Sequence, residues 1–332
     1  NASLNEIEVI NFAGASQTAT FTGAQLTAET IILNESSTGT SGLIINVGSG
    51  ETTTFTNITA GTFTSGTDTV TINGTTGNET ITGSNIASTI SGGTGDDTLT
   101  GGSQADIING GDGADALTGS AGNDTYNFNT GDVDTGESIT EASSGGTDTI
   151  SVITSTDFVN MSNASFDEIE VINFAGASQT ATFTGTQLTA ETITLTETVT
   201  GTSRLVINVG SGESADFTNI TASTFDSGTD TLTISGSTGG ETITGPNIAA
   251  TISGNAGNDN ITGGSAADII NGGNGNDTID ANDGADTLTG GSGDDIYIFN
   301  SNDVDTGETI VEASSGGTDT ISVITSTDFV NM

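Results

Sequence analysis

The stretch Gly92-Gly93-Thr94-Gly95-Asp96-Asp97-Thr98-Leu99-Thr100 decides the fold, because its nine-residue pattern recurs in register along two blocks of the chain. The pattern is G-G-x-G-x-D-x-U-x, where U is a large apolar residue. The units begin at Gly74, Gly83, Gly92, Gly101, Gly110 and Gly119, and again at Gly236, Gly245, Gly254, Gly263, Gly272, Ala281 and Gly290. Glycine allows the tight turn, and x-U-x predicts a short strand with one inward side chain.

Stacking of these units predicts rows of acids. Two nonapeptides make one turn of a flattened coil, so each loop lies on the loop two units away, at about 4.8 Å, the strand spacing. Carboxylates this close repel one another unless a cation lies between them. Roughly six to eight carboxylate and carbonyl oxygens suit Ca²⁺ better than Mg²⁺. The expected pairs are Asp97 with Asp115, Asp106 with Asp124, Asp259 with Asp277, Asp277 with Asp295, and Asp268 with Asp286. We therefore predict about five Ca²⁺ ions at these acids.

Some units lack part of the pattern. Glu79 and Glu241 replace the aspartate in the opening unit of each block, and Ser88 and Ala250 replace it in the next unit. We expect the first two units of each block to form strands without complete calcium sites. Elsewhere Gln104 and Ala266 replace the fourth glycine, and Ala281 and Asn282 replace the leading pair. The expected inward residues are Leu99, Ile108, Leu117 and Tyr126, then Ile261, Ile270, Ile279, Leu288 and Tyr297.

The composition limits the partners. The chain has 332 residues, with 43 Asp plus Glu against one basic residue, Arg204, and a formal net charge of −42. Nucleic acid is excluded as a partner because phosphate binding needs Lys and Arg, and anionic membranes are disfavoured. No apolar run is long enough to insert into a membrane. Cysteine is absent, so bound cations are the plausible stabiliser, and weak calcium modules are occupied only outside cells.

The chain is a tandem duplication. Residues 6–23 reappear unchanged at 168–185, and residues 141–161 reappear unchanged at 312–332. The second offset exceeds the first by one nonapeptide, as expected of a solenoid that changes length in whole units. The expected organisation is a Thr-rich β segment at 1–73, a nonapeptide coil at 74–127, a connecting β segment at 128–162, and the same three parts at 163–235, 236–298 and 299–332. We expect a join at 163–167 without a flexible linker.

The Thr-rich segments predict further strands. Short runs such as 7–12, 30–33, 43–47 and 69–72 are rich in Thr, Val and Ile and show no helical period. We predict an all-β parallel β-solenoid in which β-helix-like Thr-rich segments lead into the calcium-binding coils. A separate β-sandwich is the alternative.

With both kinds of segment in view, the chain resembles the RTX (haemolysin-type calcium-binding) repeat family. It is similar to S-layer and other large extracellular surface proteins that pair sequence like IEVINFAG with nonapeptides like GGTGDDTLTGG. The resemblance implies β-rolls, type I secretion from a Gram-negative bacterium, folding on meeting calcium, and a structural role at the cell surface. It also implies that loop carbonyls complete each metal site.

Several functions remain open. The first is a calcium-stabilised structural protein that self-associates into a surface layer or filament, with cell-surface polysaccharide as a possible partner. The second is the spacer region of a giant RTX adhesin. Minor alternatives are an ice-binding solenoid and an accessory module of a polysaccharide-active enzyme. Catalysis by this chain is not expected, because it has no His or Lys to support acid–base chemistry. The acidic stretch 132–137 is expected to be a turn, with a further ion as the alternative.

Overall fold

The computed structural model describes residues 4, 6–64, 67–141, 145–162, 166–226, 228–301, 303–312 and 316–325. Residues 163–165, within the expected join, lie outside this described part. The chain divides into two compact units, residues 1–156 with 160–163 and 167–171, and residues 172–332 with 157–159 and 164–166. Each unit is described by itself.

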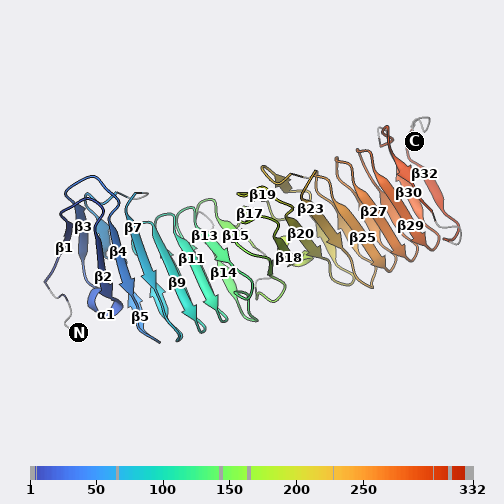
Figure 1. Ribbon diagram of the computed structural model, residues 1–332. Coiled ribbons are helices and arrows are strands. Elements are labelled where there is room, and N and C mark those ends of the chain that lie inside the picture. The colour runs from blue at the N-terminus through green and yellow to red at the C-terminus, as the bar shows by residue number, and fades with distance from the viewer. Residues whose placement is uncertain are drawn as a thin grey trace. The chain divides into compact units, whose positions relative to one another are not determined.

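Unit 1 is a stack of short parallel strands that follow one another as rungs (Figure 1). One sheet has the order β5-β8-β10-β12-β14, a second has the order β2-β4-β7-β9-β11-β13-β15, and a third has the order β1-β3-β6. The strands are β1 (Val9–Phe12), β2 (Thr18–Thr22), β3 (Ile31–Glu35), β4 (Gly42–Asn46), β5 (Thr52–Thr54), β6 (Ile58–Ala60), β7 (Thr69–Asn73), β8 (Thr80–Thr82), β9 (Ser88–Thr94), β10 (Thr98–Gly102), β11 (Ile107–Asp112), β12 (Ala116–Ser120), β13 (Thr125–Phe128), β14 (Ser138–Thr140) and β15 (Thr149–Val152).

Unit 2 repeats this arrangement. Its sheets have the orders β16-β18-β20-β23-β25-β27-β29-β31, β21-β24-β26-β28-β30-β32 and β17-β19-β22. Strands β16 (Thr156–Asp157) and β17 (Val171–Phe174) lie at the boundary between the units along the chain. The others are β18 (Thr180–Thr184), β19 (Ile193–Glu197), β20 (Arg204–Asn208), β21 (Ser214–Asp216), β22 (Ile220–Ala222), β23 (Thr231–Ser235), β24 (Thr242–Thr244), β25 (Thr251–Ala256), β26 (Asn260–Thr262), β27 (Ile269–Asn274), β28 (Thr278–Asp280), β29 (Thr287–Ser292), β30 (Ile296–Phe299), β31 (Thr309–Ile310) and β32 (Thr320–Val323).

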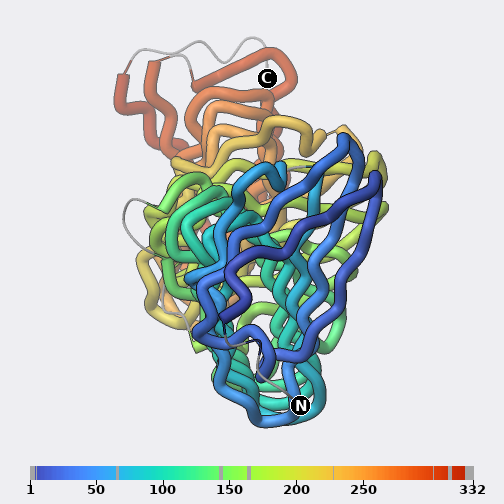
Figure 2. The backbone as a smooth tube through the Cα atoms, turned by 90° about the vertical axis from the view of Figure 1, so that its left-hand side faces the viewer, coloured from blue at the N-terminus to red at the C-terminus, as the bar shows by residue number. Residues whose placement is uncertain are grey.

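The register confirms two nonapeptides per turn. Leu99 pairs with Ile81 and Leu117 on neighbouring parallel strands, and the equivalent residues of successive turns are 18 apart. The Thr-rich strands continue the same sheets, since β4 pairs with β7 and β7 pairs with β9. The predicted parallel β-solenoid is therefore correct, and the alternative of a separate β-sandwich is wrong. In Figure 2 the turns at the N-terminal end lie one behind another.

The core consists of one or two lines of side chains beneath each sheet. Ile90, Ile108 and Tyr126 face inward from one sheet of unit 1 and are fully buried, whereas Ile107, next to Ile108, faces outward and is 40% exposed. Strand side chains alternate between the two faces, so each rung contributes one or two apolar groups. This thin core explains how the chain folds with few aromatic residues.

Two helical turns depart from the all-strand expectation. They are α1 (Gly23–Leu26) and α2 (Gly185–Leu188). In both, the backbone N–H of the residue before the helix, Thr22 or Thr184, donates to a glutamine side chain three residues later, at 2.9 Å and 2.8 Å. This T-x-x-Q arrangement is a capping box. Among the described residues, no helix has the length and apolar character needed to span a membrane.

Candidate metal centre

The loops of the nonapeptides depend on glycine at the second and fourth places. In the unit that begins at Gly92, Gly93 and Gly95 have φ of 115° and 118°, which side-chain-bearing residues rarely adopt. A Cβ atom on Gly95 would lie 2.5 Å from the carbonyl oxygen of Gly77 in the loop one turn below. Glycine at the fourth place therefore lets successive loops stack backbone on backbone.

Stacking brings together all five acid pairs expected from the sequence. In each pair the backbone N–H of the first aspartate donates to Oδ1 of the second at 2.7–2.8 Å. Each unit thus carries two rows of buried acids, one at the start of the strands of each sheet, which we call the acid ladders. Their members from the nonapeptides are Glu79, Asp97, Asp106, Asp115 and Asp124 in unit 1, and Glu241, Asp259, Asp268, Asp277, Asp286 and Asp295 in unit 2.

The second carboxylate oxygen separates the predicted ligands into two groups. In seven of them Oδ2 is buried and has no hydrogen-bond partner, and the side chain is at most 2% exposed. These seven are Asp97, Asp115, Asp124, Asp259, Asp277, Asp286 and Asp295. Leaving a buried, ionised oxygen without a partner is strongly unfavourable, so these atoms call for a cation or a proton.

The two remaining predicted ligands are satisfied by their own loops. Asp106 Oδ2 accepts a hydrogen bond from the Gly102 amide at 2.6 Å, and Asp268 Oδ2 accepts one from Gly264 at 2.9 Å. These two aspartates belong to the nonapeptides in which Gln104 or Ala266 replaces the fourth glycine. A metal ion at Asp106 or Asp268 would therefore have to share the carboxylate with that amide.

The leading glycine of a unit makes room for the unpartnered oxygen. A Cβ atom on Gly92 would lie 2.2 Å from Asp97 Oδ2, and one on Gly110 would lie 2.2 Å from Asp115 Oδ2. Gly254 has the same relation to Asp259, at 2.3 Å. These free oxygens therefore lie in cradles that a larger residue would fill, whereas Ala281 replaces the leading glycine beside Asp286. Carboxylates and backbone carbonyls form an all-oxygen donor set, which fits Ca²⁺.

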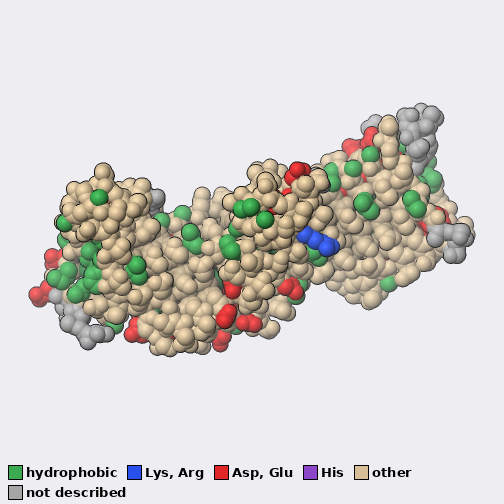
Figure 3. All heavy atoms as spheres, viewed as in Figure 1, with side chains coloured by type: hydrophobic (Ala, Val, Ile, Leu, Met, Phe, Trp, Pro, Cys, Tyr) green, Lys and Arg blue, Asp and Glu red, His purple; other side chains and the backbone are tan. Residues whose placement is uncertain are grey.

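Burial also dominates the electrostatics of the ladders. Loss of hydration, with neighbouring carboxylates as a further cause, raises the pKa of Asp97 to about 6 and that of Asp115 to about 7. The same causes raise the pKa of Asp277 to about 6 and that of Asp286 to about 7. The only basic residue of the chain is the exposed Arg204, seen in blue in Figure 3. Since Arg204 lies on β20, hydrogen-bonded to Thr233, no protein cation neutralises the ladders. A divalent cation would favour their ionised form.

The opening acids of the blocks have no free oxygen. Glu79 accepts from the Gly50 amide at 2.7 Å with Oε1 and from the Thr75 amide at 3.0 Å with Oε2. Glu241 accepts in the same way from Gly212 and Ser237, both at 3.0 Å. Both glutamates therefore bind backbone amides, and neither has an oxygen without a hydrogen-bond partner.

The ladders extend beyond the nonapeptides, which the sequence analysis did not predict. The Asp115 amide donates to Glu137 Oε2 at 2.8 Å, and the Asp124 amide donates to Asp148 Oδ1 at 2.7 Å. The steps of 22 and 24 residues differ from the 18 residues within the block, so the repeat frame misses them. A local signal exists nevertheless, because Glu137 and Asp148 each stand two residues before an inward isoleucine, as in x-D-x-U-x.

The acidic stretch 132–137 combines a turn with a ladder residue. Asp132 Oδ2 accepts from the Asn129 amide at 2.6 Å, which caps the turn. Glu137 lies in the ladder, is fully buried and has an unpartnered Oε1. Burial raises the pKa of Glu137 to about 9.

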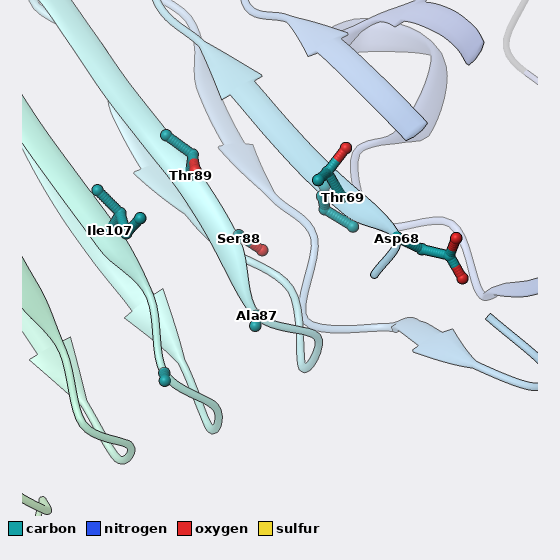
Figure 4. A pocket seen from close by; sticks show the side chains of 8 residues that line it. Asp68, Thr69, Ala87, Ser88, Thr89 and Ile107 are labelled. Atoms are coloured by element: carbon teal, nitrogen blue, oxygen red, sulfur yellow. The ribbon is translucent and has the colours of Figure 1, made fainter. Parts of the chain in front are cut away.

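A surface pocket borders one ladder, because its lining residue Ser88 donates a backbone hydrogen bond to Asp106. The pocket is lined by residues of three neighbouring strands, Thr69 of β7, Thr89 of β9 and Ile107 of β11 (Figure 4). Asp68 lines it too, but both of its carboxylate oxygens accept backbone hydrogen bonds, from Ser41 at 2.8 Å and from Thr64 at 2.6 Å. An equivalent pocket in unit 2 is lined by Asp230, Thr231, Thr251 and Ile269 among others. Both oxygens of Asp230 likewise accept backbone hydrogen bonds, from Ser203 and Asp226, so neither aspartate has an oxygen without a partner.

Comparison with known families gives one finding. The RTX calcium-binding nonapeptide repeat, a family defined over four copies, matches residues 73–108, 91–126, 249–279 and 271–303. The matches cover most of both nonapeptide blocks. No curated protein matches the chain.

Proposed function

Because the two nonapeptide blocks belong to the RTX calcium-binding repeat family, we propose that this chain is an extracellular calcium-stabilised structural protein that assembles into a surface layer or filament. The observation that carries the proposal is the row of buried, unpartnered carboxylate oxygens inside a repeated fold. A fold that concentrates acids in this way needs divalent cations to be stable at neutral pH.

Calcium would be held by the aspartates with a free oxygen. We assign this role to Asp97, Asp115, Asp124, Asp259, Asp277, Asp286 and Asp295, with carbonyl oxygens of the stacked loops as further ligands. Bound calcium would neutralise the carboxylates and tie each turn to the next. Asp106 and Asp268 stay predictions from the repeat frame, since both of their oxygens already have partners.

A structural role is favoured over catalysis by the chemistry of the side chains. The chain has no His, Cys or Lys. The acid ladders are sequestered beneath stacked loops, where a substrate has no access, and catalysis by acid pairs needs an accessible site with unlike environments.

An extracellular location follows from calcium availability and from the family. Millimolar calcium occurs outside cells, and RTX repeat proteins are typically secreted. We propose secretion of the unfolded chain by a type I system, followed by folding when it meets calcium. Self-association would then connect folded chains at the cell surface.

The test is removal of calcium from the full chain at pH 7.5. Excess chelator should abolish the far-UV β signal and dissociate chain assemblies seen by electron microscopy, and added calcium should restore both. A β signal unchanged by chelator would contradict calcium-dependent folding. Folding that depends on calcium while chains stay monomeric at every concentration would contradict the layer or filament and favour the adhesin spacer.

Ice binding would need unbroken rows of outward-facing threonines on neighbouring strands. The strand register shows which residues make up each row. Thr80 and Thr98 are neighbours on β8 and β10, but the next residue of the row is Ala116 on β12. In unit 2 the corresponding outward row contains Asn260 and Ile296. The interrupted rows give this alternative little support.

A further inference from the structure

Each nonapeptide block ends in a group of three acids that includes residues outside the repeat. In unit 1 they are Asp124, Glu141 and Asp148, and in unit 2 they are Asp295, Glu312 and Asp319. One oxygen from each of the three lies within 4.8 Å of the other two. We call these groups the closing clusters. Glu141 and Asp148 lie beyond the last matched nonapeptide of unit 1, and Glu312 and Asp319 lie beyond that of unit 2.

Unpartnered oxygens point into the closing clusters. Asp124 is fully buried and its Oδ2 has no hydrogen-bond partner. A Cβ atom on Gly119 would lie 2.3 Å from Asp124 Oδ2 and 2.3 Å from Glu141 Oε1, so both side chains converge on the space above this glycine. Glu141 Oε2 is also buried without a partner.

The same arrangement recurs in unit 2. Asp295 is fully buried, and its Oδ2 and Glu312 Oε2 lack partners. A Cβ atom on Gly290 would lie 2.3 Å from Asp295 Oδ2 and 2.7 Å from Glu312 Oε1. The same oxygens lack partners in both units, which indicates that the residues are arranged to bind a ligand.

A tyrosine fixes the glutamate of each cluster. The hydroxyl groups of Tyr126 and Tyr297 donate to Oε1 of Glu141 and Glu312. The Gly119 amide also donates to Glu141 Oε1, at 3.1 Å, and the Gly290 amide to Glu312 Oε1, at 2.9 Å. Oε1 is therefore occupied by the protein, whereas Oε2 stays available to a ligand. These are the only two tyrosines of the chain.

We propose that each closing cluster is a calcium site that ends the block, with Asp124, Glu141 and Asp148 as its side-chain ligands in unit 1 and Asp295, Glu312 and Asp319 in unit 2. The inference rests on the proposed calcium binding and extends it to residues outside the nonapeptide pattern. Three carboxylates with no Lys, Arg or His beside them form a hard, anionic donor set. Oxygens bound to one Ca²⁺ lie at most about 4.8 Å apart, since each is about 2.4 Å from the ion, and the three oxygens of each cluster lie within this limit.

The site gives the last nonapeptide a partner. Within a block, each acid has a nonapeptide loop one turn further along except in the last two nonapeptides, where Glu137 follows Asp115 and Asp148 follows Asp124 in unit 1. Calcium between Asp124, Glu141 and Asp148 would tie the connecting segment to the block.

Terbium tests this proposal, because Tb³⁺ replaces Ca²⁺ and emits when a nearby tyrosine is excited. The chain has no tryptophan, so tyrosine-sensitised emission arises only near Tyr126 and Tyr297. We expect the wild-type full chain to show sensitised emission that excess calcium suppresses. In the double variant Glu141→Gln/Glu312→Gln, the intensity of this emission should fall about tenfold, and the chain should bind about two fewer calcium ions.

Matched variants separate the closing clusters from the nonapeptide sites. Asp97→Asn/Asp259→Asn should reduce bound calcium but keep the tyrosine-sensitised emission. Tyr126→Phe/Tyr297→Phe should lose the emission while keeping the calcium count. Wild-type protein that binds calcium yet shows no sensitised emission would overturn the closing sites and leave the proposed function intact. Unchanged emission and calcium count in the glutamine variant, folded by circular dichroism, would do the same. Protein that folds and binds no calcium at all would overturn the proposed function itself.

Discussion

Identical sequences end the two units on opposite sheets. In unit 1 the strand TISV, β15, pairs with β13 and continues the sheet that contains β9 and β11. In unit 2 the same four residues form β32, which pairs with β30 and continues the other sheet, with β26 and β28. The tail therefore has no preference of its own for one side of the coil.

The difference arises from one extra nonapeptide. The first block has six nonapeptides and the second has seven, and each nonapeptide forms half a turn of the coil. An added half turn moves everything after it to the opposite sheet, yet the closing cluster and its tyrosine form again. The tail is thus positioned by the last nonapeptide, through Asp124 and Tyr126 in unit 1 and Asp295 and Tyr297 in unit 2. Block length is free to vary in steps of nine residues.

The largest expected effect comes from a deletion that is shorter than one whole nonapeptide. Removing residues 281–285 puts the following acids and inward residues out of phase, so the coil beyond Asp277 should be lost. Removing residues 281–289 should preserve the fold, return the tail to the sheet of β27, and reduce bound calcium by about one ion. Calcium titration calorimetry and circular dichroism measure both. Equal damage from the two deletions would refute positioning by the last nonapeptide.

The next effect is the pH dependence of the calcium-free protein. Burial raises the pKa of Asp115 from 3.8 for the free side chain to about 7 in the folded state, and it raises the pKa of Glu137 from 4.5 to about 9. The folded state therefore holds more protons than the unfolded state above about pH 4, so the free energy of unfolding should fall as pH rises through 7. We expect the metal-free β signal to persist at pH 5 and to be lost at pH 8.

This pH dependence should differ between the units. Burial raises the pKa of Glu308 only to about 7, against about 9 for Glu137. Both glutamates have the same unfolded-state pKa, so Glu308 stops lowering the free energy of unfolding near pH 7, whereas Glu137 continues to lower it up to about pH 9. Between pH 7 and 9, unit 1 should therefore lose more of its metal-free stability than unit 2. Tyrosine fluorescence of Tyr297→Phe reports unit 1, and that of Tyr126→Phe reports unit 2. Stability of the metal-free protein that increases with pH would contradict the raised pKa values.

The smallest expected effect is local and tests whether the two units share one kind of core. Ile108→Ala in unit 1 and Ile270→Ala in unit 2 remove fully buried side chains and should each lower the free energy of unfolding by about 2–5 kcal/mol with calcium bound. The adjacent controls Ile107→Ala and Ile269→Ala remove exposed side chains and should change it by at most about 0.5 kcal/mol. Denaturant titration measures all four. A large loss from a control variant would show that the outer face is also packed.

Much of the coil could be predicted from the sequence because the repeat has a strict period. A nine-residue frame fixes which side chains face inward and which acids meet after 18 residues. It could not show that Asp106 and Asp268 bind their own loops, since this depends on how Gln104 and Ala266 reshape the turn. That difference decides which carboxylates are free for a cation.

The closing clusters escaped prediction for another reason. Glu141 and Asp148 lie outside the nine-residue period, and they reach Asp124 because the chain after β14 continues the coil and sets β15 beside β13. Likewise the helical turns at Gly23 and Gly185 depend on a capping box within Thr-rich sequence that favours strands. Non-periodic contacts require the three-dimensional path of the chain.

The parallel stacking has a mechanical consequence. Hydrogen bonds between successive turns run along the axis of the coil, so tension on the ends of a unit would load one turn at a time. Each 18-residue turn that peels away would release about 60 Å of extended chain in place of about 4.8 Å of coil. We expect such a coil to lengthen in steps of one turn under load and to shorten again when the force is removed, with the ions between the turns resisting each step.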